Sequence, residues 1–110
     1  MPGKINNRRN VRVFCNVPAR VEGPRGPIRG TCRNLSVGGL FFLGGVLPVG
    51  KTADFTIELP QGKVQAQGEV RYHYEYPNEG QGMGVKFVRI TQEHLEWVTR
   101  WVETHEPVPS

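Results

Sequence analysis

Two short groups of residues near the start of the sequence have the chemistry to bind an anionic, planar ligand. In the first group, Arg8 and Arg12 are four residues apart and Arg9 follows Arg8. A guanidinium group binds phosphate through paired hydrogen bonds, stacks on flat rings and recognises the edge of guanine. Such arginines are also common in basic tails, so the group alone does not identify a site.

The second group consists of Asn34, Ser36 and Gly39, and it begins 22 residues after Arg12. Asn and Ser side chains supply polar groups that complement the remaining edge of a guanine base. Gly38 and Gly39 have no Cβ, so the backbone there can approach a flat ligand closely. Each group alone is a weak signal, but their joint order on one chain favours a single binding site.

The charge of the sequence is concentrated near these groups. Residues 1–33 contain eight basic residues and one acidic residue, whereas residues 34–110 contain six basic and nine acidic residues. The net charge is therefore +7 in the first part and −3 in the second. This asymmetry favours an anionic or nucleic-acid partner for the first part, with a solvated basic surface as the alternative.

Alternation of apolar and polar residues predicts strands at six places, with turn residues between them. The expected strands cover residues 11–22, 28–33, 39–43, 52–59, 64–74 and 83–90. Tyr72 and Tyr74 are expected on the apolar face of the fifth strand. Short strands at this spacing predict an all-β fold, a six-stranded antiparallel barrel.

A helix is expected at the end of the chain, over residues 91–105. Thr91 is a suitable N-cap, and Val98, Trp101 and Val102 belong to an apolar stripe at helical spacing. This stripe is expected to close the barrel, with a partner surface as the alternative. Residues 1–10 lack periodicity and are expected to form a flexible arm ahead of one domain over residues 11–106.

At these residues the sequence resembles the PilZ domain family, whose two signatures are R-x-x-x-R and [DN]-x-S-x-x-G. Arg8 and Arg12 match the first signature, and Asn34, Ser36 and Gly39 match the second. The likeness continues to residues 82–87 and so covers nearly the whole chain. It implies a PilZ-type barrel with a C-terminal helix that binds the second messenger cyclic di-GMP.

The resemblance also implies a role for each signature residue. Arg8 and Arg12 would hold phosphates and guanine edges, with Arg9 assisting. Asn34 and Ser36 would read the other guanine, and Gly39 would make room for it. Asn34 is an allowed variant of the signature, although a neutral amide accepts a hydrogen bond less strongly than a carboxylate.

A match to the phosphate-binding loop pattern G-x-x-x-x-G-K-[ST] occurs at residues 45–52. That loop must lead into a helix whose amino end holds phosphates, but strand-like alternation follows here. The match is therefore interpreted as chance. His73, His94 and His105 are isolated in the sequence, so no catalytic group is predicted and the protein is not expected to be an enzyme.

The cysteines and the hydropathy pattern predict a cytoplasmic protein. Cys15 and Cys32 could face each other across a hairpin, and in a reducing compartment they are expected to be buried thiols. No Cys and His spacing resembles a zinc site, so neither a metal nor a cofactor is expected. No run of eighteen apolar residues occurs, and no membrane insertion is predicted.

The sequence therefore predicts a bacterial receptor that binds cyclic di-GMP and relays the signal to an effector protein through ordering of its N-terminal arm. One alternative is a PilZ-like adaptor that binds proteins without a nucleotide. The other is a small basic barrel that binds RNA or DNA, with tyrosines of the fifth strand stacking the bases. The net negative charge after residue 33 argues against nucleic acid.

Overall fold

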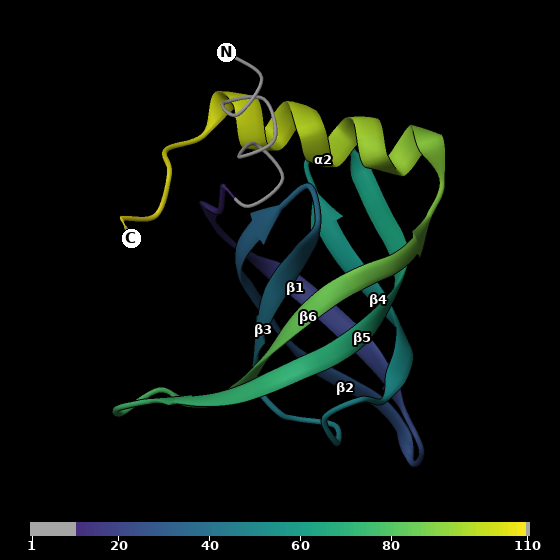
Figure 1. Ribbon diagram of the computed structural model, residues 1–110, viewed down its shortest axis with the longest axis vertical. Coiled ribbons are helices and arrows are strands. Elements are labelled where there is room, and N and C mark those ends of the chain that lie inside the picture. Colours follow the sequence, from purple (N-terminus) through teal and green to yellow (C-terminus); the bar gives the residue numbers. More distant parts are fainter. Residues whose placement is uncertain (1–10, 110) are drawn as a thin grey trace.

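The structure, a computed structural model, describes residues 11–109, and its six strands close into an antiparallel barrel (Figure 1). The strands are β1 (Val13–Gly23), β2 (Gly26–Ser36), β3 (Gly39–Leu43), β4 (Thr52–Leu59), β5 (Gly62–Tyr76) and β6 (Gly80–Ile90). Their order around the barrel is β1, β2, β3, β6, β5 and β4. The predicted all-β fold is confirmed, including the number of strands and their antiparallel pairing.

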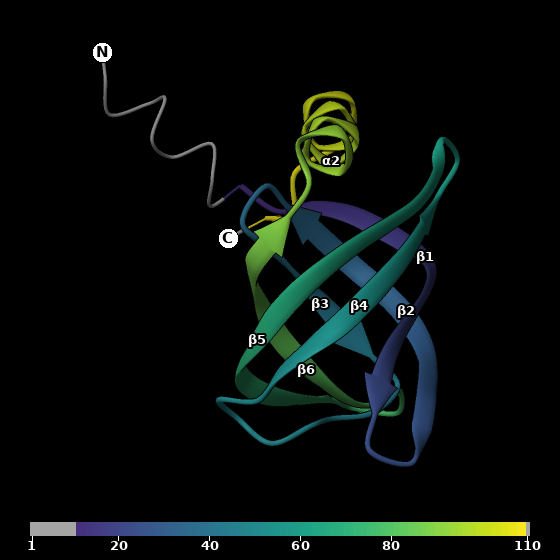
Figure 2. The same cartoon turned by 90° about the vertical axis from the view of Figure 1, so that its right-hand side faces the viewer.

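Helix α2 (Gln92–Thr104) lies across one end of the barrel (Figures 1 and 2). It begins where expected, because the Thr91 side chain accepts a hydrogen bond from the His94 amide at 3.3 Å. Val98, Trp101 and Val102 are buried and extend the core inside the barrel. The apolar stripe of the helix therefore closes the barrel.

The start of β1 differs from the predicted strand. The ladder with β2 begins at Val13, two residues later than expected, and it shifts register between Phe14 and Val17. Asn16 in this bulge has a φ of 50°, a left-handed conformation that asparagine tolerates better than most residues. Simple alternation from residue 11 cannot predict such an inserted residue.

The far end of β5 also departs from the prediction. A register shift between Val70 and Tyr72 turns the tyrosines outward, so that Tyr72 is 44% exposed and Tyr74 is 52% exposed. The expectation that they belong to the apolar inner face was wrong. Beyond this bulge, β5 and β6 continue as a hairpin that projects from the barrel (Figure 1).

The projecting hairpin is attached to β2 through Arg33. The Arg33 guanidinium donates to both carboxylate oxygens of Glu79, at 2.6 and 3.2 Å. It also lies 4.9 Å from the centre of the Tyr76 ring. The side chain of Arg33, the residue before Asn34 on β2, is therefore bound to the hairpin.

Candidate functional site

Antiparallel pairing brings Arg12 of the first signature close to Ser36 and Gly39 of the second. Val13 lies opposite Leu35 in the β1–β2 ladder, which brings Arg12 to the level of Ser36. Ser36 in turn lies opposite Gly39, the first residue of β3. Arg8 and Arg9 lie outside the described residues, so their predicted roles stay predictions.

Arg12, Ser36 and Gly39 line one cleft with a volume of about 570 Å³, which we call the basic cleft. Its lining comes from the start of β1, the β2–β3 turn and the middle of β5 and β6, and consists of Arg12, Ser36, Gly38, Gly39, Leu40, Arg71, Tyr72, Gly84, Val85 and Lys86. Three of these residues are cations and none is acidic. The cleft therefore has a positive field that no lining carboxylate neutralises.

Tyr72 holds the side chain of Arg12 over this cleft. The Arg12 Nη1 atom donates a hydrogen bond to the Tyr72 hydroxyl at 3.3 Å. The Tyr72 ring lies across Gly84, where an added Cβ would overlap the ring. Because Gly84 has no side chain, the ring lies against β6 and presents its hydroxyl to Arg12.

Ser36 and Gly39 shape the turn between β2 and β3. The Ser36 hydroxyl donates to the Gly39 carbonyl oxygen at 3.3 Å and accepts from the Gly38 amide at 3.2 Å. A Cβ at Gly39 would overlap the carbonyl oxygen of Val85 on the next strand. Both residues therefore fix the cleft wall, in addition to any contact they make with a ligand.

Asn34 is placed differently from the other signature residues. It lies between Phe14 on β1 and Phe41 on β3 in the ladders, and it is only 6% exposed. Its Oδ1 atom is buried without a hydrogen-bond partner among the described residues. A buried carbonyl oxygen without a donor costs about 1–3 kcal/mol, which is unusual in a folded protein.

The PilZ domain family model matches residues 6–104, which is most of the sequence. The chain belongs to the PilZ domain family. No protein in the curated set matches the sequence significantly.

Solved structures with the same fold include other PilZ proteins. The PilZ domain of YcgR from Escherichia coli, solved with c-di-GMP, superposes with a TM-score of 0.73 at 15% identity, covering 89% of this chain and 91% of that chain. PlzA from Borreliella burgdorferi, also in complex with c-di-GMP, has a TM-score of 0.65 at 12% identity, covering 92% and 44%.

The inhibitor of motility MotI/DgrA from Bacillus subtilis has a TM-score of 0.75 at 20% identity, covering 84% of this chain and 48% of that chain. The present chain therefore spans about half the length of that protein. At these identities, the likeness of all three proteins establishes the shared fold.

Two cations and a tyrosine of the basic cleft were not predicted as site residues in this PilZ domain. Arg71 and Lys86 lie on the polar faces of β5 and β6, and both are exposed. The sequence predicts Tyr72 on the apolar face of the fifth strand, with base stacking as the alternative. Their convergence depends on the bulge after Val70 and on the pairing of Gly39 with Lys86, which sequence alternation does not specify.

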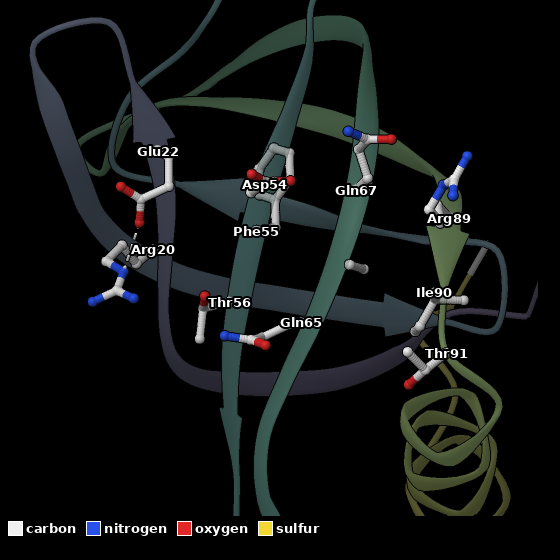
Figure 3. A pocket seen from close by; sticks show the side chains of 11 residues that line it. Arg20, Glu22, Asp54, Phe55, Thr56, Gln65, Gln67, Arg89, Ile90 and Thr91 are labelled. Atoms are coloured by element: carbon white, nitrogen blue, oxygen red, sulfur yellow. Dashed lines mark ion pairs between the residues drawn. The ribbon is translucent and has the colours of Figure 1, made fainter.

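A second hollow lies elsewhere on the barrel wall, and we call it the polar groove (Figure 3). It has a volume of about 410 Å³ and is lined mainly by β1, β4, β5 and the end of β6. Arg20 and Arg89 contribute its positive charges, and Glu22 and Asp54 its negative charges. The Arg20 Nε atom lies 3.1 Å from a carboxylate oxygen of Glu22, so part of this charge is paired (Figure 3).

The loop that matches the phosphate-binding pattern is not built as a phosphate cradle. The Gly50 amide donates a hydrogen bond to the Val70 carbonyl oxygen at 2.7 Å, and the Lys51 amide donates to the Pro48 carbonyl oxygen at 3.0 Å. Strand β4, rather than a helix, begins at Thr52. The expected strand after the loop is confirmed, and this supports the interpretation of the match as chance.

His73 and His94 make hydrogen bonds to backbone atoms of other segments and so have structural roles. His73 Nε2 donates to the Leu47 carbonyl oxygen at 2.7 Å, and His94 Nδ1 accepts from the Gln65 amide at 3.1 Å. Within residues 11–109, no group of three or more His, Cys, Asp or Glu side chains is arranged to hold a metal ion. No helix in the same part of the chain is long and apolar enough to cross a membrane.

Both cysteines are free thiols, Cys32 fully buried and Cys15 half-buried in the β1 bulge. A hydrogen bond with Cys15, together with burial, raises the pKa of the Cys32 thiol well above its usual value. Cys32 therefore stays protonated at neutral pH and is a poor nucleophile.

Proposed function

We propose that this PilZ domain binds cyclic di-GMP in the basic cleft and acts as a receptor rather than as an enzyme. The observation that carries the proposal is the set of three cations, Arg12, Arg71 and Lys86, around a cleft without a lining carboxylate. Phosphate groups favour such a field, and arginine can also bind a guanine edge. The YcgR and PlzA structures with c-di-GMP support the choice of ligand.

The size and polar groups of the site are consistent with this ligand. A cleft of about 570 Å³ falls within the range of roughly 300–1,000 Å³ that is typical of small-molecule sites. The unpartnered Oδ1 of Asn34 is an acceptor for which a guanine N–H group would be a suitable donor. Reaching it requires a small opening of the surrounding side chains, since Asn34 is buried.

The proposal extends to residues 1–10 and to signal relay. Arg8 and Arg12 would hold the same ligand, with Arg9 assisting, so binding would draw the N-terminal arm towards the cleft. Ordering of the arm would create or hide a surface for an effector protein. The arm contributes little apolar surface, so without a ligand little offsets its ordering cost of roughly 1–2 kcal/mol per residue.

Calorimetric titration with cyclic di-GMP tests the binding proposal, with GTP and a short single-stranded RNA as matched ligands. We expect saturable binding of cyclic di-GMP and much weaker binding of the other two. Binding of the RNA alone would favour the nucleic-acid alternative. Absence of binding by any of the three would favour an adaptor that works without a nucleotide.

Hydrogen exchange tests the relay. Exchange at residues 5–12 should slow markedly in the saturated complex, while exchange over residues 53–59 should change little. Ligand at about a hundred times its dissociation constant should also stabilise the fold by roughly 2.7 kcal/mol. Fast exchange of the arm in a saturated complex would contradict the relay but leave the binding site intact.

A further inference from the structure

The first residues of β1 are held by the segment that follows α2, Glu106–Val108, which we call the C-terminal strap. The Phe14 amide donates to the Glu106 carbonyl oxygen at 3.2 Å, and the Val108 amide donates to the Arg12 carbonyl oxygen at 2.8 Å. Between these bonds, Val13 and Pro107 form an antiparallel bridge. The strap thus pairs with β1 at Val13, the residue next to Arg12.

Trp101 of α2 holds the same stretch of β1 from a second direction. Its indole Nε1 atom donates to the Phe14 carbonyl oxygen at 3.2 Å, and its side chain is buried. The Trp101 ring stacks on His105 with a centroid separation of 3.7 Å and an angle of 6°. His105 in turn donates through Nδ1 to the Trp101 carbonyl oxygen at 2.9 Å, which fixes the start of the strap.

These bonds matter for Arg12 because it lies outside the β1–β2 ladder, whose first pair is Val13 with Leu35. The Arg12 carbonyl oxygen accepts a backbone hydrogen bond from the strap, and the Arg12 side chain bonds only to Tyr72 among the described residues. A flexible cationic side chain binds more tightly when its backbone is already fixed, since less freedom is lost on binding. The strap and Trp101 supply that fixation.

We infer that Trp101 and the C-terminal strap position Arg12 for the ligand, so that docking of the strap and occupancy of the basic cleft stabilise each other. The inference rests on the proposed function, because it concerns binding of cyclic di-GMP. Thermodynamic linkage makes the coupling reciprocal. Loss of the strap weakens ligand binding, and bound ligand strengthens the bonds between the strap and β1 by the same factor.

Two substitutions in one helix test this coupling. Trp101→Phe removes the indole donor and keeps an aromatic ring, whereas Trp97→Phe changes a tryptophan that lies against His94 and the Gly62 turn, away from β1. We expect Trp101→Phe to weaken cyclic di-GMP binding about fivefold or more, at the low end of typical coupling. We expect Trp97→Phe to change the affinity less than about twofold. Deletion of residues 106–110 should match Trp101→Phe.

A double-mutant cycle separates positioning from a general structural effect. If Trp101 acts through Arg12, then Trp101→Phe has no further effect on affinity in an Arg12→Ala background. An equal loss in both backgrounds would assign Trp101 a structural role and overturn the inference. Retained wild-type affinity in both Trp101→Phe and the deletion variant would overturn it as well.

The reverse direction of the coupling is measured in the protein with Trp97→Phe, where Trp101 is the remaining tryptophan of two. Adding cyclic di-GMP should change the emission of Trp101 and slow exchange of the Val108 amide. Unchanged emission and exchange at saturation would contradict the coupling while leaving binding established. Absence of saturation in the wild-type protein would instead contradict the proposed function, and the inference with it.

Discussion

The basic cleft and the polar groove are two hollows on the wall of the same barrel, and charge distinguishes them more than size. Their volumes are about 570 and 410 Å³, and each is lined by side chains of several strands. The groove has two arginines and two carboxylates, whereas the cleft has three cations and no carboxylate. An arginine count alone would not separate them. The absence of lining carboxylates is why we propose the cleft, and not the groove, as the anion site.

Replacing one arginine in each hollow by alanine should test the difference between the cleft and the groove most directly. Arg12→Ala removes one of the three lining cations of the cleft and should cost about 1–3 kcal/mol of binding, or roughly five- to 150-fold in affinity for cyclic di-GMP. Arg20→Ala removes a cation that Glu22 already pairs, so affinity should stay within about twofold. Calorimetry measures the affinity of both variants. Equal losses of affinity would refute the proposal that cyclic di-GMP binds in the cleft.

Gly39 in the cleft wall should be more sensitive to an added Cβ than Gly45. Gly39→Ala places a Cβ against backbone atoms of Val85 and Lys86, and overpacking of this kind typically costs about 1–3 kcal/mol in stability. Gly45→Ala is the control, because its Cβ would meet only the end of the Ile28 side chain. Denaturant unfolding measures both variants. A wild-type midpoint for Gly39→Ala would mean that the turn can shift without cost.

Two amide side chains sharpen the comparison further: Asn34, which is buried two residues before Ser36 of the cleft, and Gln65, which lines the polar groove. Asn34→Ala removes the cost of an unpartnered buried acceptor but also leaves a small cavity. Because the two effects oppose each other, stability should change by less than about 1 kcal/mol, while affinity for cyclic di-GMP falls roughly fivefold. Gln65→Ala in the polar groove should leave the affinity unchanged. A large loss of stability without loss of binding would assign Asn34 a packing role instead.

The two cations missed by sequence reasoning should have smaller effects. Arg71→Ala and Lys86→Ala should each weaken binding about two- to fivefold and reduce its dependence on salt, because exposed charges contribute mainly through the long-range field. Arg89→Ala, in the polar groove, is the matched control. Titrations at two salt concentrations distinguish these cases. Equal salt dependence of binding in all three variants would mean that the charges of the cleft act on the ligand no more strongly than those of the groove.

The smallest effect concerns Arg33, a cation beside the site that is already paired. The hydrogen bond from Arg33 lowers the pKa of Glu79 below its usual value of 4.5. The resulting stabilisation is complete above that value and is lost as pH falls through the lowered folded value. Glu79→Gln should therefore unfold slightly more easily than wild type at neutral pH and equally in strong acid. Identical unfolding profiles at all pH values would mean that the pair contributes nothing.

Periodicity predicted the architecture because the inner faces of the strands are strongly apolar. Phe55 and Ile57 on β4, for example, are buried where alternation places Phe55, Ile57 and Leu59 on one face. The helix was also predictable, since Thr91 and the stripe through Val98 and Trp101 follow helical rules. These features depend on local patterns that one sequence contains.

The site was predictable only in part. Arg12, Ser36 and Gly39 line one cleft, as their joint order in the sequence suggests. Alternation predicts Tyr72 inside the barrel, whereas a bulge turns its side chain outward to Arg12. Bulges and strand register depend on pairing between distant segments, which no local pattern specifies. Arg71 could not be assigned for that reason.

The bridge between Val13 and Pro107 also has a consequence for folding kinetics. It joins residues separated by most of the chain, and the barrel closes through another distant contact, between Ala19 on β1 and Ile57 on β4. Such non-local pairing folds slowly because a long loop must close before any contact compensates its entropy. During synthesis, the backbone next to Arg12 therefore reaches its final position only after Pro107 and Val108 have left the ribosome. The basic cleft is therefore among the last parts of the domain to form.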